Sequence, residues 1–176
     1  MKIILRNIVL LLFLISQACN TPQTQPVKEA MTTQQPDYRF LLDDQELSYD
    51  SSWAIALGAD EYGMKNYVLA YLKAGPNRDQ DSATAAEIQK AHLENIMRMA
   101  KQGQLVVAGP FTDDHEVKGI YILNVKTVAE AEELVETDPA IEAGRLTMEL
   151  HPWYGSAALM LVNKIHKKVE KKSVAQ

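Results

Sequence analysis

The sequence predicts an α+β fold, and three observations support that prediction. Two stretches carry apolar residues at helical spacing, and each begins with a helix-capping pattern. Four short segments rich in Val, Ile, Leu and Tyr have the length and the bounding turn residues of strands. Along the chain these elements follow the order strand, helix, strand, strand, helix, strand.

The first predicted strand and the first predicted helix are separated by a polar loop. Residues 67–72 form an unbroken apolar run, which is typical of a strand buried on both faces. Thr84 and Glu87 match the capping box. In this motif the threonine side chain accepts from the backbone N–H of the glutamate, and the glutamate side chain accepts from the backbone N–H of the threonine. The helix is predicted to end at Gly103, because glycine adopts the left-handed conformation of a C-terminal cap.

A histidine lies on the apolar face of this predicted helix. His92 is four residues from both Ile88 and Ile96, so the three side chains share one face. A histidine in such a position is more often a hydrogen-bonded core residue than a catalyst. The alternative is general acid–base chemistry, because imidazole titrates near neutral pH.

The remaining three strands are predicted from shorter patterns. Residues 105–108 and 119–125 are apolar and close in sequence, which favours a β-hairpin. Residues 145–150 alternate between apolar and polar, as a half-buried strand does. Pro152 and Gly155 are expected to break the chain after this last strand.

Two further helices are predicted in the second half of the chain. Thr127 and Glu130 form a second capping box. The helix that they open should end before Asp138-Pro139, because the residue before a proline avoids the helical region. Residues 157–169 carry apolar residues on one side and lysines on the other, which predicts a last amphipathic helix.

The order β-α-β-β-α-β is that of the ferredoxin-like fold. In this fold two helices cover one face of a four-stranded sheet and the other face is bare. A bare apolar face marks an interface, so we expect a homodimer in which two sheets face each other in an α+β barrel. The helix at 157–169 could instead cover the bare face, which would leave a monomer.

The N-terminus has the features of a secretory signal. Lys2 and Arg6 form a basic region, and the apolar run at 8–15 is too short to span a bilayer. The only cysteine of the chain, Cys19, directly follows Ala18, and this placement predicts cleavage and lipidation of Cys19. The alternative is an ordinary secretory signal with an incidental cysteine. Either way we expect the protein in a bacterial cell envelope, lipid-anchored on the periplasmic side or secreted.

Composition divides the chain into one domain with appendages. We expect a signal peptide at 1–18, a flexible tether rich in Thr, Gln and Pro at 19–37, an N-terminal extension that packs on the domain at 38–64, the domain at 65–155, and a C-terminal helix with a basic tail at 156–176. The net charge of −5 argues against nucleic acid as a partner. The lysines of the last helix are expected to be solvated, with attraction to an anionic membrane surface as the alternative.

Several separated motifs resemble the YciI, or YCII-related, family. They span residues 67–153 and are Ala91-His92-Leu93, Gln104-Leu105-Val106-Val107-Ala108-Gly109-Pro110-Phe111, Asp138-Pro139 with Ala143-Gly144, and Pro152-Trp153. The resemblance implies a ferredoxin-like fold, a dimeric α+β barrel and a histidine–aspartate pair in a pocket. The family histidine falls on His92 and the family aspartate on Asp138. A group similar to the family acts as a dehydrochlorinase on chlorinated hydroxyquinols.

The chain departs from this family pattern in two respects. Ala140 stands where the family often has phenylalanine, which implies a wider pocket and another substrate. The secretory signal is also unlike a typical cytoplasmic member, so a cytoplasmic metabolic role does not carry over.

The pair His92 and Asp138 suits proton transfer without a cofactor. A carboxylate bonded to one imidazole nitrogen fixes the tautomer and raises the basicity of the other. We therefore expect a lyase or isomerase, dehydrochlorinase-like, that acts on a small cyclic or aromatic substrate. The alternative is a non-catalytic lipoprotein that binds a small molecule. Asp138 itself has a simpler explanation, since Asp-Pro after a helix is common turn chemistry.

Four further residues are candidates for binding the substrate: Arg78, Tyr71, His151 and Trp153. Arg78, Tyr71 and His151 each also have an ordinary structural explanation, as a solvated loop arginine, a packing tyrosine and a strand-end histidine. No cofactor is expected. No metal is expected either, because the four histidines of the chain show no paired ligand spacing.

Overall fold

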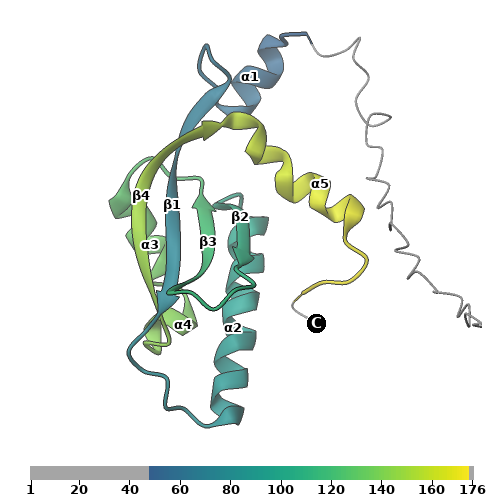
Figure 1. Ribbon diagram of the computed structural model, residues 1–176. Coiled ribbons are helices and arrows are strands. Elements are labelled where there is room, and N and C mark those ends of the chain that lie inside the picture. The colour runs from purple at the N-terminus through teal and green to yellow at the C-terminus, as the bar shows by residue number, and fades with distance from the viewer. Residues whose placement is uncertain (1–47, 175–176) are drawn as a thin grey trace, which may run out of the picture. The chain divides into compact units, whose positions relative to one another are not determined.

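The computed structural model describes residues 48–174, which form a four-stranded antiparallel sheet with helices (Figure 1). The strand order is β2-β3-β1-β4. In chain order the elements are α1 (Ser51–Leu57), β1 (Met64–Ala74), α2 (Ser82–Lys101), β2 (Leu105–Pro110), β3 (Val117–Leu123), α3 (Val128–Val135), α4 (Pro139–Glu142), β4 (Leu146–Ser156), the 3₁₀-helix η2 (Ala157–Leu161) and α5 (Val162–Val169). The predicted α+β, ferredoxin-like fold is confirmed, and so is the extra C-terminal helix.

The predicted signal peptide, tether and lipidation of Cys19 lie outside the described residues. Within residues 48–174, none of the helices has the length and apolar character that crossing a membrane requires. α1 lies within the described part of the predicted N-terminal extension, residues 48–64, and contacts η2.

Helix α2 begins earlier than the capping pattern predicted, so the assignment of Thr84 and Glu87 as a capping box was wrong. The N-cap is Asp81, whose carboxylate accepts from the backbone N–H groups of Ala83 and Thr84 at 2.9 and 3.0 Å. The Thr84 hydroxyl donates to the same carboxylate at 2.8 Å, so it is not available as a cap. A carboxylate is favoured here because the free N–H groups of a helix start carry positive charge.

The other helix ends follow the sequence more closely. Gly103 has a φ of 71° and ends α2 as predicted. The capping box of Thr127 and Glu130 is present at the start of α3. The sequence did not predict α4, a single turn that starts directly after Asp138. Asp138 caps it by accepting from the backbone N–H of Ala140 at 2.9 Å.

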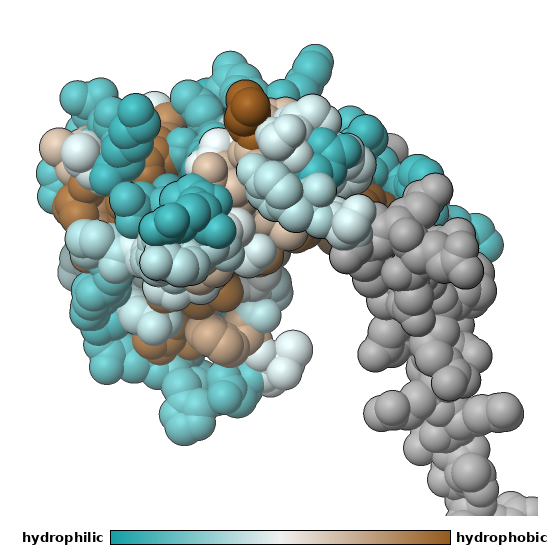
Figure 2. Space-filling view, turned by 90° about the horizontal axis from the view of Figure 1, so that it is seen from above, coloured by the Kyte–Doolittle hydropathy of each residue, from teal (hydrophilic) through white to brown (hydrophobic). Residues whose placement is uncertain are grey.

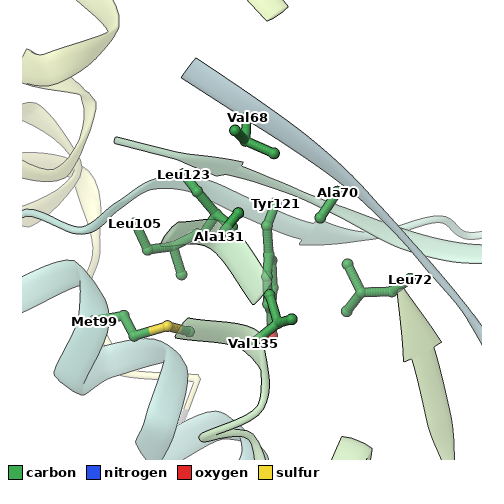
Figure 3. Close-up of a cluster of buried hydrophobic side chains, with 9 residues drawn as sticks. All are labelled: Val68, Ala70, Leu72, Met99, Leu105, Tyr121, Leu123, Ala131 and Val135. Carbon is green, nitrogen blue, oxygen red and sulfur yellow. The ribbon is translucent and has the colours of Figure 1, made fainter. Parts of the chain in front are cut away.

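The main core lies between the sheet and the two longer helices of the motif. Its buried members come from β1, β2, β3, α2 and α3 and point toward one another (Figure 3): Val68, Ala70, Leu72, Met99, Leu105, Tyr121, Leu123, Ala131 and Val135. Even-numbered residues of β1 face this core, because side chains alternate between the faces of a strand. α2 and α3 therefore cover the same face of the sheet.

The last strand continues past the predicted break. β4 pairs with β1 from Leu146 to Ser156, and Pro152 lies opposite Val68. The prediction that Pro152 and Gly155 end the strand was wrong. β4 is an edge strand, and proline is tolerated at an edge where its missing N–H would have faced away from the neighbouring strand.

The second face of the sheet is covered only in part. Tyr67, Val106 and Ile122 form a smaller buried cluster there, against which Leu159 and Met160 of η2 pack. Residues 157–169 are therefore a 3₁₀-helix followed by an α-helix, and the first part covers one region of the face that was predicted to be bare. Seen from the end that carries α1, hydrophobic residues reach the surface in separate places among hydrophilic ones (Figure 2).

Candidate active site

The structure brings His92 of α2 into contact with Asp138, the residue just before α4. His92 lies in the middle of α2, and Asp138 precedes α4, which packs against α2. The Nδ1 atom of His92 is 2.9 Å from both carboxylate oxygens of Asp138. Because an ionised carboxylate only accepts hydrogen bonds, this contact places the proton on Nδ1 and leaves a lone pair on Nε2 of the neutral ring.

Asp138 holds its orientation through the backbone. Its side chain is fully buried, and Oδ1 accepts from the backbone N–H of Ala140 as well as from His92. Two hydrogen bonds to one buried carboxylate offset part of the cost of removing its charge from water. Asp138 therefore has two roles, since it caps the turn at Asp138-Pro139 and also bonds His92. The turn explanation and the catalytic explanation of Asp138 are compatible.

Tyr121 of β3 is a third member of the site, and the sequence analysis missed it. Its hydroxyl oxygen is 3.5 Å from Nε2 of His92 and donates to Oδ2 of Asp138 at 3.4 Å. The two rings stack with centroids 6.3 Å apart. Burial raises the pKa of the Tyr121 hydroxyl far above its usual range, and the negative charge of Asp138 adds to the rise. The hydroxyl therefore stays protonated, and its single proton can be donated to one of these two acceptors at a time.

The sequence signal for Tyr121 was weak. Alternation in β3 puts Tyr121 on the same face as Leu123, but alternation does not reveal which face meets the helices. That knowledge requires the register, in which Tyr121 lies opposite Ala70 of β1.

A second polar network adjoins the pair. Arg98 donates through two of its nitrogens to Oδ1 of Asn95, at 3.2 and 2.6 Å, and also donates to the Thr137 hydroxyl at 2.9 Å. Thr137 directly precedes Asp138, so Arg98 ties α2 to the turn that presents the carboxylate. Asn95 is buried one turn after His92, and its Nδ2 atom has no hydrogen-bond partner among the described residues.

The pair is closed to solvent in this conformation. The side chain of His92 is 9% exposed and that of Asp138 is 0% exposed. A cavity of about 460 Å³ lies between α3 and β4, with Val135 and Ile141 on one side and Met148 on the other. A second cavity of about 510 Å³ is lined by Gln104, Lys126 and Glu133, among others. His92 lines neither of these two cavities.

The other predicted binding residues do not meet the pair within one chain. Tyr71, His151 and Trp153 lie on the opposite face of the sheet. In the register His151 lies opposite Leu69 and Trp153 opposite Tyr67, and both partners belong to the cluster on that face. Tyr71 and His151 contact each other edge to face at 5.5 Å, and Trp153 packs on Tyr67 at 5.8 Å. These positions follow from strand alternation, which sends odd-numbered residues of β1 away from the helices.

Arg78 also stays apart from the pair. It is exposed, and it donates to the backbone oxygen of Arg145 at 3.2 Å. Its contact closes the loop between β1 and α2 onto the segment that leads into β4. Among residues 48–174, no group of three or more His, Cys, Asp or Glu side chains is placed to hold a metal ion.

Comparison with known proteins assigns the family of this domain. The chain is similar to the solved structure of 5-chloro-2-hydroxyhydroquinone dehydrochlorinase (TftG) from Burkholderia phenoliruptrix in complex with 2,5-dihydroxybenzoquinone, with 23% sequence identity over 49% of this chain and 92% of that chain and a TM-score of 0.37. No curated protein matches the chain significantly. Residues 67–153 match the model of the YCII-related domain. These residues therefore form a domain of the YCII-related family, as the motifs around His92 and Asp138 predicted.

Proposed function

We propose that the YCII-related domain is a small enzyme, a lyase or isomerase that needs no cofactor, in which His92 moves a proton. The observation that carries the proposal is the contact of His92 Nδ1 with both oxygens of the buried Asp138, at 2.9 Å each. A carboxylate in this position fixes one tautomer and stabilises the imidazolium that forms when Nε2 accepts a proton. General base catalysis of this kind contributes about 10²- to 10⁴-fold to a rate.

The substrate must reach Nε2, and the neighbour of Nε2 in the closed conformation is Tyr121. The contacts of the Tyr121 hydroxyl with the pair are long, at 3.5 and 3.4 Å, and so they are weak. A substrate that displaces this hydroxyl by a small movement of β3 or α2 would meet Nε2 directly. The Tyr121 hydroxyl would then be free to donate to an oxygen of the substrate, which suits an enol or a phenol.

The test is an activity screen with matched variants. Purified protein is screened on cyclic enols, lactones and halogenated phenols, including chlorinated hydroxyquinols. For any substrate turned over, His92→Ala and Asp138→Asn should each reduce kcat/KM by about 10²- to 10⁴-fold while the protein still folds. The amide oxygen that Asp138→Asn introduces would still cap α4, so this variant separates orientation of the ring from stability. His115→Ala is the control, because His115 has a carboxylate partner, Asp113, in an exposed loop away from the pair.

Two results would count against an enzyme. One is turnover that follows only the amount of folded protein in both variants. The other is an imidazole ¹⁵N chemical shift of His92 that is the same in wild type and in Asp138→Asn, which would mean that the two side chains do not touch in solution.

A second candidate function is binding without catalysis, and the burial of the pair favours it. With 9% of its side chain exposed, His92 would serve as a core residue, and the cavity of about 460 Å³ between α3 and β4 would hold a small apolar molecule. Met148→Trp should then fill this cavity and weaken ligand binding, while Asp138→Asn leaves it unchanged. The enzyme proposal expects the reverse order of effects.

We also propose the homodimer with facing sheets. Support comes from the second face of the sheet, where Leu69, Tyr71 and Ile120 are only half-buried beyond the region that η2 covers. Sedimentation of the protein at micromolar concentration should give a dimer, and Tyr71→Glu should shift it toward monomer. A wild-type monomer would mean that η2 and α5 cover the face sufficiently.

The envelope location and the lipid anchor at Cys19 are likewise proposed, on the placement of the sole cysteine behind a short apolar run. Metabolic labelling with a clickable fatty acid should mark the wild-type protein and leave Cys19→Ala unmarked. Equal labelling of the two proteins would remove the anchor from the proposal.

A further inference from the structure

Helix α5 exposes an aliphatic strip that is not used for packing. The side of α5 that faces the domain carries Asn163, whose Nδ2 donates to the backbone oxygen of Leu105 at 2.7 Å. Ile165 and Val169 are four residues apart and share another side of the helix. They are 55% and 74% exposed, and neither belongs to a hydrophobic cluster of the described chain.

Lysines surround this strip. Five of them lie on α5 and directly after it, namely Lys164, Lys167, Lys168, Lys171 and Lys172. All five are exposed, and none of them makes an ion pair with another residue of the part that the structure describes. The chain as a whole has a net charge of −5, so positive charge is concentrated here against the overall balance.

We propose that the exposed surface of α5 and of the residues directly after it, where Ile165 and Val169 are flanked by these five lysines, docks on a bilayer surface rich in anionic phospholipid. A helix that lies in the membrane interface buries aliphatic side chains at the boundary of the acyl chains while its lysines contact phosphate groups. Exposed aliphatic side chains flanked by lysines fit both parts of that environment. A nucleic acid would satisfy the lysines and leave Ile165 and Val169 in water, so the lipid surface fits better.

Docking through this face would set the orientation of the domain. The path from the sheet to α5 is held at two points. The backbone N–H of Ala157 donates to the Gly63 oxygen at 2.9 Å, and Asn163 bonds the Leu105 oxygen at the start of β2. Because α5 is fixed to the β2 edge, a docked helix brings that edge of the sheet toward the bilayer. One short helix buries little apolar surface and would bind a membrane weakly. In this proposal the lipid anchor proposed at Cys19 holds the protein at the membrane, and α5 sets its orientation there.

The experiment places a reporter on the strip in the full chain. An environment-sensitive fluorophore is attached at Ile165→Cys in a Cys19→Ala background, in which it is the sole thiol. Vesicles of phosphatidylcholine containing phosphatidylglycerol should shift the emission to the blue, and vesicles of phosphatidylcholine alone should not. Binding to a membrane surface weakens by about fivefold for each lysine lost, so Lys164→Gln with Lys168→Gln should weaken it by about 25-fold.

The matched control is Lys90→Gln with Lys101→Gln, which removes the same charge from α2 and should leave the titration of the vesicles nearly unchanged. The amino-terminal segment is identical in all variants, so it cannot produce a difference between the two pairs. Equal loss in both pairs, or an equal blue shift with neutral vesicles, overturns the proposal. So does a shift without vesicles that grows with protein concentration, which would assign the strip to a second copy, or a shift produced by short duplex DNA alone.

Discussion

Two histidines lie within hydrogen-bond distance of a carboxylate, on opposite faces of the same sheet. His92 Nδ1 is 2.9 Å from the Asp138 oxygens, and His151 Nε2 is 2.8 Å from Glu149 Oε1. The distances are nearly equal, but the surroundings differ. The side chains are 9% and 0% exposed in the first pair, and 45% and 48% exposed in the second.

The difference in burial decides what each pair can do. Glu149 shares its charge with Lys73 at 2.6 Å, and the bond to Lys73, more than the bond to His151, lowers the pKa of the Glu149 carboxyl. Water and the Lys73 cation therefore compete with His151 for the Glu149 carboxylate. Asp138 has no such competitor among the contacts of the described chain, and the bond from Ala140 holds it in place. Distance alone would not distinguish the two pairs, whereas solvent access and the other partners of each carboxylate do.

The largest expected effect is the loss of stability on removing the buried carboxylate. Asp138→Ala should lower the free energy of unfolding by about 3–5 kcal/mol, because it breaks a buried pair and removes the cap of α4. Glu149→Ala should change stability little. Urea denaturation of both variants measures the contrast, and comparable losses would show that burial does not separate the pairs as described.

The sequence predicted the partners of the buried pair but not their setting. The motifs placed His92 on an apolar helix face and Asp138 just after the end of the second helix, and both placements are found. The same kind of local pattern failed at Thr84, because Asp81 three residues earlier is a competing cap that the pattern does not weigh. Tyr121 was not predicted, since its position beside His92 depends on the register of β3 with β1.

A double-mutant cycle sharpens the comparison directly. His92→Ala, Asp138→Ala and the double variant should give a coupling energy of about 1.5–3 kcal/mol, at the upper end of the range for residues in contact. The cycle with His151→Ala and Glu149→Ala should give no resolvable coupling. Thermal or urea unfolding supplies all the values, and a coupling near zero for the buried pair would contradict a persistent contact.

Tyr121 gives the next prediction, which depends on pH. Tyr121→Phe should cost about 1 kcal/mol at neutral pH through the lost hydrogen bond. The folded-state pKa of Tyr121 is raised above the unfolded value of about 10, so its protonated form contributes stability that is lost as pH rises above 10. Between neutral pH and pH 11, roughly, the wild type should therefore lose more stability than Tyr121→Phe does. An unchanged difference between the two proteins across this range would place the hydroxyl in water.

The smallest expected effect concerns the exposed pair and salt. High ionic strength screens exposed charges strongly and buried charges weakly. The ¹⁵N shifts of His151 should therefore move with added sodium chloride, while those of His92 stay fixed. Glu149→Gln should remove most of the salt response of His151. A salt response of the same size in His92 would indicate that water reaches the buried pair.

Pro152 has a consequence for how copies of this protein meet. β4 is a long edge strand, and a free edge presents N–H and C=O groups to which a strand of another molecule can add. Because β4 stays paired with β1 at Pro152, the missing N–H falls on the outer side of the strand and interrupts the row of donors there. The proline thus makes it harder for a strand of another molecule to pair with this edge, and so it protects the edge against aggregation.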